Sequence, residues 1–418
     1  MARSRLLALL LALAALATPL LLRAQPSGPE RQAALEAVAG PLYDQLADIR
    51  SIASPGAPPP VLVRSRADNR RFIEQEIKRR YSENQLEAER KSMVAWGVLP
   101  ADYDLQRLFL DLLEEQVSAY YDPLGKVMVV GDWLPADQQR AALMHELVHA
   151  LQDRELPIDS FITPDPGQGD RLLARQALIE GEAVALTFDL LLKPQGIDIS
   201  RLPDLSTTQG LIASSSGGPV IAKAPKFVRD LLLFPYIEGL GFIYQVRKRQ
   251  PWSSMSVIYR DPPHSTTQIL HPEKYLDTRE DPLPVTIPDL SPLLPGLQHV
   301  SEDDLGEFAL GAVLALHLGD TEGLRAAKGW RGDRYRIWED TAGRLADQLK
   351  ASVERRHPGL AGKAAVRPHG LVVWSEDGRG FAVERRGTSI ILLEQVPTTV
   401  LDRAREALWR ARPAGATR

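Results

Sequence analysis

The 418-residue sequence contains no cysteine. This absence excludes disulfide bonds, thiolate metal ligands and a cysteine nucleophile. A metal ion would therefore have to be held by histidine and carboxylate side chains. A large excess of either charge is also missing, because 50 basic residues stand against 54 acidic ones, for a formal net charge of −4. We therefore expect no nucleic acid partner, since dedicated nucleic-acid binders usually carry a strong basic excess.

Beyond the N-terminus, the sequence also lacks an uninterrupted apolar run long enough to cross a membrane. The N-terminus itself has Arg3 and Arg5, an apolar run from Leu6 to Leu22, and then a polar stretch with proline and glycine. This order is typical of a secretory signal peptide, here residues 1–24 with cleavage after Ala24. An uncleaved membrane anchor is the competing interpretation. Either way we expect an exported protein, periplasmic or extracellular, whose only membrane contact would be this segment.

The rest of the chain is predicted to be mostly helical with few strands. Apolar residues recur at helical spacing in an N-terminal region, residues 25–99, and through most of residues 100–280. A proline-rich stretch at 281–300 is the expected linker, and residues 301–418 mix helices and strands. The predicted fold class is α+β, a mostly helical domain with a small edge-strand sheet and then a smaller C-terminal α+β domain. Residues 194–226, rich in glycine, serine and proline, are predicted to form a long mobile loop.

The stretch "LMHELVHALQD" carries two histidines four positions apart. On a helix these positions lie on one face, so His145 and His149 can direct both imidazoles at one zinc ion. Glu146 is turned away by about 100° and can reach a water on the metal without being a ligand. The alternative is a solvated face of a surface helix. Apolar residues on both flanks of the histidines argue against it, because histidines in such a helix need a partner.

A zinc site needs at least one more protein ligand, and a later helical segment, "QALIEGEAVALTFDL", offers one. Glu180 follows an apolar stretch, and Gly181 directly after it would let another helix approach closely. Glu182 lies on the opposite side of the helix, so both glutamates cannot bind one ion. We choose Glu180 as the third ligand and Glu182 as a supporting or structural carboxylate. Three protein ligands leave the fourth position open for water, which marks a catalytic site.

The HExxH motif, followed by a helix carrying "EG", resembles the gluzincin group of zinc metallopeptidases. The resemblance implies that His145, His149 and Glu180 are zinc ligands and that Glu146 is the general base. It also implies a zincin-like metallopeptidase domain at residues 100–280. Further segments are similar to a largely uncharacterised family of exported bacterial proteins, namely "HALQD", "ALIEGEA", "PPHSTTQILHPEKY" (262–275), "LGEFAL" (305–310) and "GWRGDRY" (329–335).

A peptidase also needs an edge strand to align its substrate and a donor to stabilise the oxyanion. Residues 126–130, "KVMVV", directly precede the histidine helix and are the predicted edge strand, although a plain core strand would look the same. His271 is the leading candidate for the catalytic donor, ahead of Tyr236, Tyr259 and His264. Asp153 lies one turn beyond His149 and is predicted to orient that ligand, with capping or a solvent-facing role as the alternatives.

Three functions remain open from the sequence. The first is an exported zinc metallopeptidase that acts on a peptide or protein substrate, with Glu146 as general base. The second is a zinc amidohydrolase that cleaves other amides with the same residues. The third is an envelope binding or assembly factor that keeps the metal without turnover. The glutamate at position 146 argues against the third, because a purely structural zinc site has no need of a base.

Overall fold

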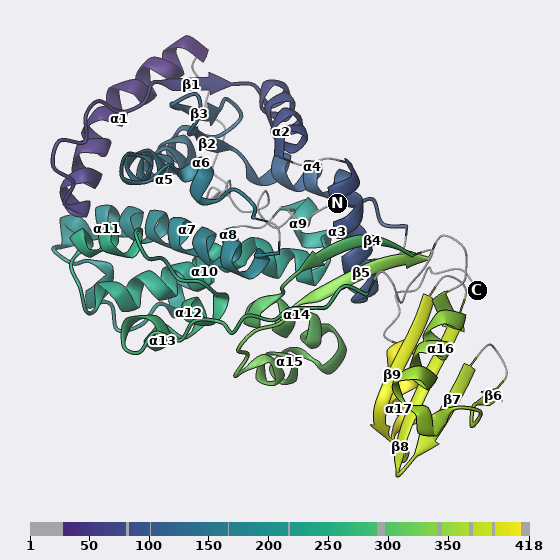
Figure 1. Cartoon of the computed structure of the whole chain (residues 1–418). Coiled ribbons are helices and arrows are strands. Elements are labelled where there is room, and N and C mark those ends of the chain that lie inside the picture. Colours follow the sequence, from purple (N-terminus) through teal and green to yellow (C-terminus); the bar gives the residue numbers. More distant parts are fainter. Residues whose placement is uncertain are drawn as a thin grey trace.

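The computed structural model describes residues 28–80, 83–100, 102–165, 167–215, 218–290, 297–340, 345–367, 371–386 and 389–410. Within them the chain is mostly helical and has small sheets, in agreement with the predicted α+β class (Figure 1). The predicted signal peptide lies outside the described residues. Among the residues that are described, no helix combines the length and the apolar character needed to cross a membrane.

A three-stranded sheet packs against the helix that carries the two histidines. Its strands are β1 (Val61–Arg64), β2 (Ala119–Asp122) and β3 (Val127–Gly131), in the order β1-β3-β2. β3 pairs parallel with β1 and antiparallel with β2. The prediction that residues 126–130 form an edge strand is therefore wrong, because β3 is central and β2 is an edge. β3 is buried over almost its whole length, as expected of a strand covered on both faces.

Four long helices build most of the core, and the first two of them pack on the sheet. They are α1 (Gly28–Arg50), α5 (Ala136–Glu155), α7 (Gly169–Leu192) and α10 (Lys226–Arg247). α5 contacts α1, β2 and β3 as well as α7, and α7 in turn packs along α10. In Figure 1 the sheet, α1 and α5 form the upper part of the molecule, and α7 and α10 run below them. The histidine helix is thus held on several sides by other elements.

Two glycines allow α7 and α10 to approach each other at backbone contact. A Cβ added to Gly181 would lie 2.2 Å from the carbonyl carbon of Gly239, and one added to Gly239 would lie 2.2 Å from the carbonyl oxygen of Ala177. The prediction that Gly181 permits the close approach of another helix is confirmed. Because Glu180 directly precedes this contact, the crossing point of the two helices also sets the position of its carboxylate.

We expect Gly181→Ala to lower the free energy of unfolding by about 1–3 kcal/mol, because the added methyl group meets backbone rather than a movable side chain. This loss should exceed the gain of up to about 1 kcal/mol that alanine brings to a helix interior. Gly210→Ala is the matched control, since a Cβ there meets nothing within 4 Å. Urea unfolding of both variants measures the difference. Equal stability of the two variants would contradict the close contact.

The segment that was predicted to be a long mobile loop contains short helices instead. Its described part forms η2 (Lys193–Gln195), η3 (Ile199–Arg201), α8 (Ser206–Ser215) and α9 (Pro219–Lys223). α8 packs on α10, and α9 packs on α4 (Leu105–Gln116). Both carboxylate oxygens of Glu115 accept backbone N–H groups at the start of α9, from Val220 and Ile221 at 2.8 Å. Contacts with α10 and α4 therefore hold the described part of this segment against the rest of the protein.

Elements that follow the predicted linker at 281–300 still pack with the main core. β4 (Leu297–Asp303) pairs with β5 (Tyr335–Asp340), and between them α14 (Gly306–Leu318) buries Ala309, Ala312 and Val313 in the main core. Residues 345–410 have two small cores of their own. They lie to one side of the molecule in Figure 1, with their sheet in the order β6-β7-β8-β9. The elements of this part are α16 (Leu345–Arg356), η6 (Pro358–Leu360), β6 (Ala365–Arg367), β7 (Leu371–Glu376), β8 (Arg379–Arg386), β9 (Ser389–Pro397) and α17 (Leu401–Arg410).

Aspartates join the segment after β4 to the beginning of α7. Asp303 accepts the backbone N–H of Gly169 at 2.9 Å, and Asp304 accepts that of Asp170 at 2.8 Å. Both thereby satisfy N–H groups at the helix N-terminus, where negative charge is favoured. Burial, with the neighbouring Asp303, raises the pKa of Asp304 to about 7. The helix that carries Glu180 is thus anchored at its start by residues of the later chain.

The remaining elements contribute side chains both to this core and to the surface. They are α2 (Arg66–Arg80), α3 (Glu83–Ala95), α6 (Ile158–Phe161), η4 (Trp252–Ser254), α11 (Met255–Ile258), α12 (Thr266–Leu270), α13 (Glu273–Leu276) and α15 (Asp320–Ala327).

Candidate metal centre

The motif helix α5 is a buried helix with ordinary signals at its ends. Pro135 precedes its first residue, Asp137 lies in its first turn and Arg154 in its last, which suits the helix dipole. Most of its second half is buried, including His149. His145 is the more accessible of the two histidines, with 12% of its side chain exposed. The interpretation of this stretch as a solvated surface helix is excluded by this burial.

Three donor atoms of the predicted ligands lie together. His145 Nε2 is 3.2 Å from His149 Nε2 and 3.2 Å from Glu180 Oε2, and His149 Nε2 is 3.5 Å from Glu180 Oε2. A regular tetrahedron with arms of about 2.0–2.1 Å, the usual zinc–ligand distances, has corners about 3.3–3.4 Å apart. The three atoms therefore form one face of a zinc-sized tetrahedron. Among the described residues, this is the group of histidines and acids that could hold a metal ion.

The charges of this group suit a cation. Burial raises the pKa of Glu180, but His149 and His145 outweigh it, and the pKa falls to about 2. Burial likewise lowers the pKa of His149, yet the Glu180 carboxylate raises it to about 9. At neutral pH the Glu180 carboxylate is thus ionised, and it stabilises the protonated, positively charged form of His149. A metal ion must displace a proton from His149 in order to bind, so acid weakens metal binding.

Glu146 is buried beside the group but does not belong to it. Its Oε2 accepts the backbone N–H of Tyr121 in β2 at 2.9 Å. Burial raises the pKa of Glu146, and the nearby Glu180 acts in the same direction. A carboxylate with a raised pKa next to a metal position is suited to take up a proton. The position predicted for the general base therefore has the surroundings that this role requires.

A buried amide that the sequence reasoning did not single out supports His149. Gln152 Oε1 lies 2.7 Å from His149 Nδ1, while Gln152 Nε2 donates to the carbonyl oxygen of Ile179 and to Glu182 Oε2, each at 2.9 Å. Glu182 also pairs with Arg50 at the end of α1. The spacing of Gln152, three residues after His149 on the same helix, was the signal in the sequence that could have identified it.

The structure places the candidate catalytic donors in different parts of the protein. The ring of Tyr236 in α10 lies 6.3 Å from that of His145, between centroids. His271 follows α12, and its Nε2 lies 2.8 Å from Glu307 Oε1 in α14. His271 is not part of the histidine–glutamate group. Its role as a donor stays a prediction, and Tyr236 is the candidate whose ring lies near a predicted ligand, His145.

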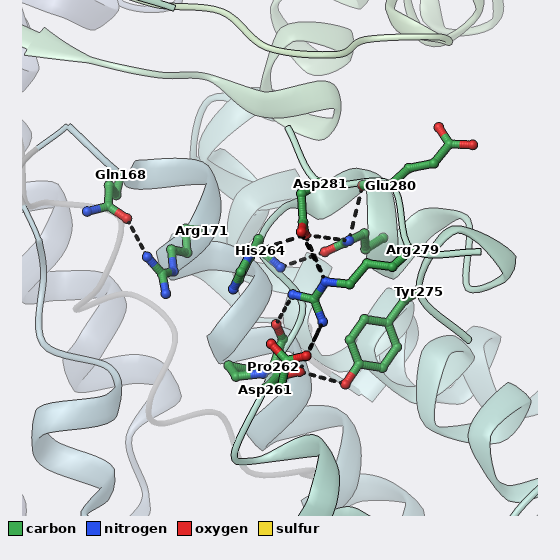
Figure 2. Close-up of polar contacts among 10 residues, drawn as sticks. Gln168, Arg171, Asp261, Pro262, His264, Tyr275, Arg279, Glu280 and Asp281 are labelled. Atoms are coloured by element: carbon green, nitrogen blue, oxygen red, sulfur yellow. Dashed lines mark hydrogen bonds and ion pairs between the residues drawn. The ribbon is translucent and has the colours of Figure 1, made fainter. Parts of the chain in front are cut away.

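His264 belongs to a separate polar network (Figure 2). Its Nδ1 lies 3.1 Å from Asp281 Oδ1, and Arg279 bonds both Asp281 and Asp261. Gln268 accepts the backbone N–H of His264 and donates to Asp281. These contacts hold the segment "PPHSTTQILHPEKY" against Arg279 and Asp281, which follow it in the chain. The segment therefore has a structural function.

Asp153 acts at the end of α5 and on β2. Its Oδ2 accepts the hydroxyl of Tyr121 at 2.8 Å and the ammonium group of Lys126, and its Oδ1 accepts the backbone N–H of Ile158 at 3.1 Å. These contacts tie the end of α5 to β2 and to the start of α6, and Gln152 takes the place next to His149.

Comparison with known proteins adds one match. Residues 102–197 match the model of a family described as Peptidase_M78, IrrE N-terminal-like domain. No curated protein and no solved structure matches the chain. The matched segment contains His145, Glu146, His149 and Glu180, and it leaves α1 and α10 outside. Over these residues the chain is similar to a family of zinc-peptidase-like domains.

Proposed function

We propose that the protein is an exported zinc-dependent metallopeptidase of the gluzincin type, with His145, His149 and Glu180 as zinc ligands. The observation that carries this proposal is the zinc-sized triangle of three donor atoms with a buried carboxylate beside it. The similarity of residues 102–197 to a zinc-peptidase-like family supports it. The apolar run from Leu6 to Leu22 supports export.

The residues around the metal position suit peptide hydrolysis. A bound zinc ion would supply Lewis acidity, which makes a water more acidic and polarises the scissile carbonyl. Glu146 is held through Oε2 by Tyr121, so its Oε1 is the atom that takes the proton of the attacking water. The same carboxyl group then delivers this proton to the departing amine. The raised pKa of Glu146 favours the first of these two steps, because it makes the carboxylate a stronger base.

The edge strand β2 is suited to align a peptide substrate. Gly131 donates to the carbonyl oxygen of Ser118, and bonded pairs alternate along an antiparallel ladder. Tyr120 and Asp122 therefore direct their backbone groups toward β3, while Ala119 and Tyr121 direct theirs outward. The bond from Tyr121 N to Glu146 agrees with this direction. An extended peptide can pair with this edge and thereby bring its carbonyl groups past the metal position.

Tyr236 is our proposed oxyanion donor, and its hydroxyl group can be tested alone. We expect Tyr236→Phe to lower kcat by about 10²-fold, the loss typical of one oxyanion donor, with little change in zinc content or KM. Tyr244→Phe, on the same helix, is the control, because its hydroxyl bonds the carbonyl oxygen of Leu202. His271→Asn is assayed alongside. If that variant loses kcat and Tyr236→Phe does not, the donor is His271.

The proposal as a whole is tested with the purified chain. Metal analysis should find one zinc ion per chain, and the protein should hydrolyse unfolded casein. A wild-type protein without stoichiometric zinc would refute the peptidase proposal. A zinc protein that is inactive on casein and on broad peptide libraries, but cleaves other amides, would be the amidohydrolase. Zinc with no turnover on either class of substrate would favour the binding or assembly factor.

A further inference from the structure

A chain of buried polar contacts leads away from His149 to the first long helix. His149 Nδ1 meets Gln152, Gln152 meets Glu182, and Glu182 meets the guanidinium group of Arg50. Arg50 and Glu182 are almost fully buried, with 3% and 0% of their side chains exposed. The chain therefore joins three helices, α5, α7 and α1, within the protein interior.

The contacts of Gln152 determine which nitrogen of His149 faces the metal position. The amide nitrogen Nε2 of Gln152 points at two acceptors, the Ile179 carbonyl and the Glu182 carboxylate. The amide oxygen Oε1 of Gln152 must therefore be the atom that faces the imidazole. The amide oxygen accepts only, and His149 Nδ1 must then carry the proton. In the neutral ring the lone pair therefore belongs to Nε2, which faces His145 and Glu180, as metal binding requires.

The amide alone cannot guarantee this orientation, because it presents an acceptor and a donor of nearly the same shape. The Ile179 carbonyl and the Glu182 carboxylate remove the ambiguity together, since both accept and neither donates. A buried carboxylate in turn needs a cationic partner. Arg50 fills this role and is itself held by Glu155 at 2.6 Å and by the carbonyl oxygen of Trp252 at 3.0 Å.

We propose that Arg50 is a positioning residue of the metal centre, acting through Glu182 and Gln152 on His149. The residue lies outside the segment that matches the zinc-peptidase-like family, so that similarity does not assign it. The proposal rests on the proposed function only in that His149 is a metal ligand. It implies that α1 contributes to metal affinity although it provides no ligand.

The test is a double-mutant cycle on zinc affinity, measured with the full chain by competition with a chromophoric chelator. Loss of a supporting residue typically weakens metal binding by about 10–100-fold, and we expect this for Gln152→Leu and for Arg50→Met. If Arg50 acts through Gln152, then Arg50→Met in the Gln152→Leu background should cause no further loss. Arg50→Lys should restore most of the affinity, since a lysine can still pair with Glu182.

Two further variants separate positioning from folding. Arg50→Met leaves Glu182 buried without its nearest cation, and this variant could fail to fold. Arg50→Met/Glu182→Met replaces the pair by apolar side chains, an exchange that is often neutral for stability, and should lose zinc affinity all the same. Arg405→Met is the control, because Arg405 pairs with buried Glu384 in the C-terminal part. The Arg405→Met variant should bind zinc with the affinity of the wild type.

The outcomes are distinct. Unchanged zinc affinity of folded Arg50→Met or of the double methionine variant overturns this inference. So does a cycle in which the losses from Arg50→Met and Gln152→Leu multiply, because Arg50 would then act independently of the amide. A wild-type protein that binds no zinc refutes the proposed function instead. Zinc binding by the wild type with an unaffected Arg50→Met variant leaves the proposed function standing and removes only the role of Arg50.

Discussion

Glu146→Gln is expected to lower kcat for peptide hydrolysis by about 10³-fold, within the range known for loss of a general acid–base group. Glutamine has the same shape, and its amide oxygen can still accept the N–H of Tyr121, so the side chain should stay in place. It cannot take a proton at neutral pH, and this is the property that the reaction needs. Zinc content should therefore remain at the wild-type level while turnover is lost.

The measurement pairs metal analysis with casein hydrolysis on the same preparation. Glu115→Gln serves as the matched control, because Glu115 also accepts backbone N–H groups but at the start of α9. It should keep both zinc and activity. If Glu146→Gln retained full turnover, Glu146 would not be the base, and the proposed mechanism would fail even with zinc in place.

Glu180→Ala is expected to lower zinc affinity by more than about 100-fold, which is the upper value for losing a residue that merely supports a ligand. Two effects oppose each other in this variant. Removing the carboxylate lowers the pKa of His149 from its value of about 9 and so relieves competition by protons. It also removes a ligand and a negative charge beside a doubly charged ion. The second effect should dominate, because the carboxylate attracts a divalent ion more strongly than a single proton.

Zinc competition titrations at several pH values decide between these effects. With Glu180→Ala the affinity should be low throughout and should depend less on pH near neutrality than in the wild type. Asp189→Asn is the control on the same helix, since Asp189 is buried and bonds the N–H of Ile199 and the indole of Trp252. Wild-type affinity in Glu180→Ala would mean that the third ligand is another residue.

The three predicted metal ligands could be recognised in the sequence because each is marked by residues close to it in the chain. His145 and His149 need only helical spacing to share a face, and Glu180 was marked by the apolar residues before it and Gly181 after it. The close approach at Gly181 follows from the absence of a side chain. In each case a few neighbouring residues determine the geometry, and the structure brings the three predicted ligands together.

Other features depended on distant parts of the chain and were missed for that reason. The order β1-β3-β2 places β3 in the centre of the sheet. An apolar run has the same sequence pattern in a central strand and in an edge strand, so the sequence could not distinguish the two. Gln152 has only its spacing from His149 as a signal, and Arg50 shows no pattern of its own, because its contact with Glu182 joins two different helices. The short helices within 194–226 were hidden by glycine and serine, and their stability comes from packing on α10 and α4.

The contact between Arg50 and Glu182 has a consequence for the order in which activity can appear during folding. The two residues are separated by 132 positions in the sequence. Contacts of such long range carry a high loop-closure cost and form only when much of the chain has already collapsed. On the proposed role of Arg50, the HExxH helix would reach its full zinc affinity only after α1 has docked. Under the proposed function, a partly folded chain would therefore bind the metal weakly, and peptide hydrolysis would begin only after these two distant segments have come together.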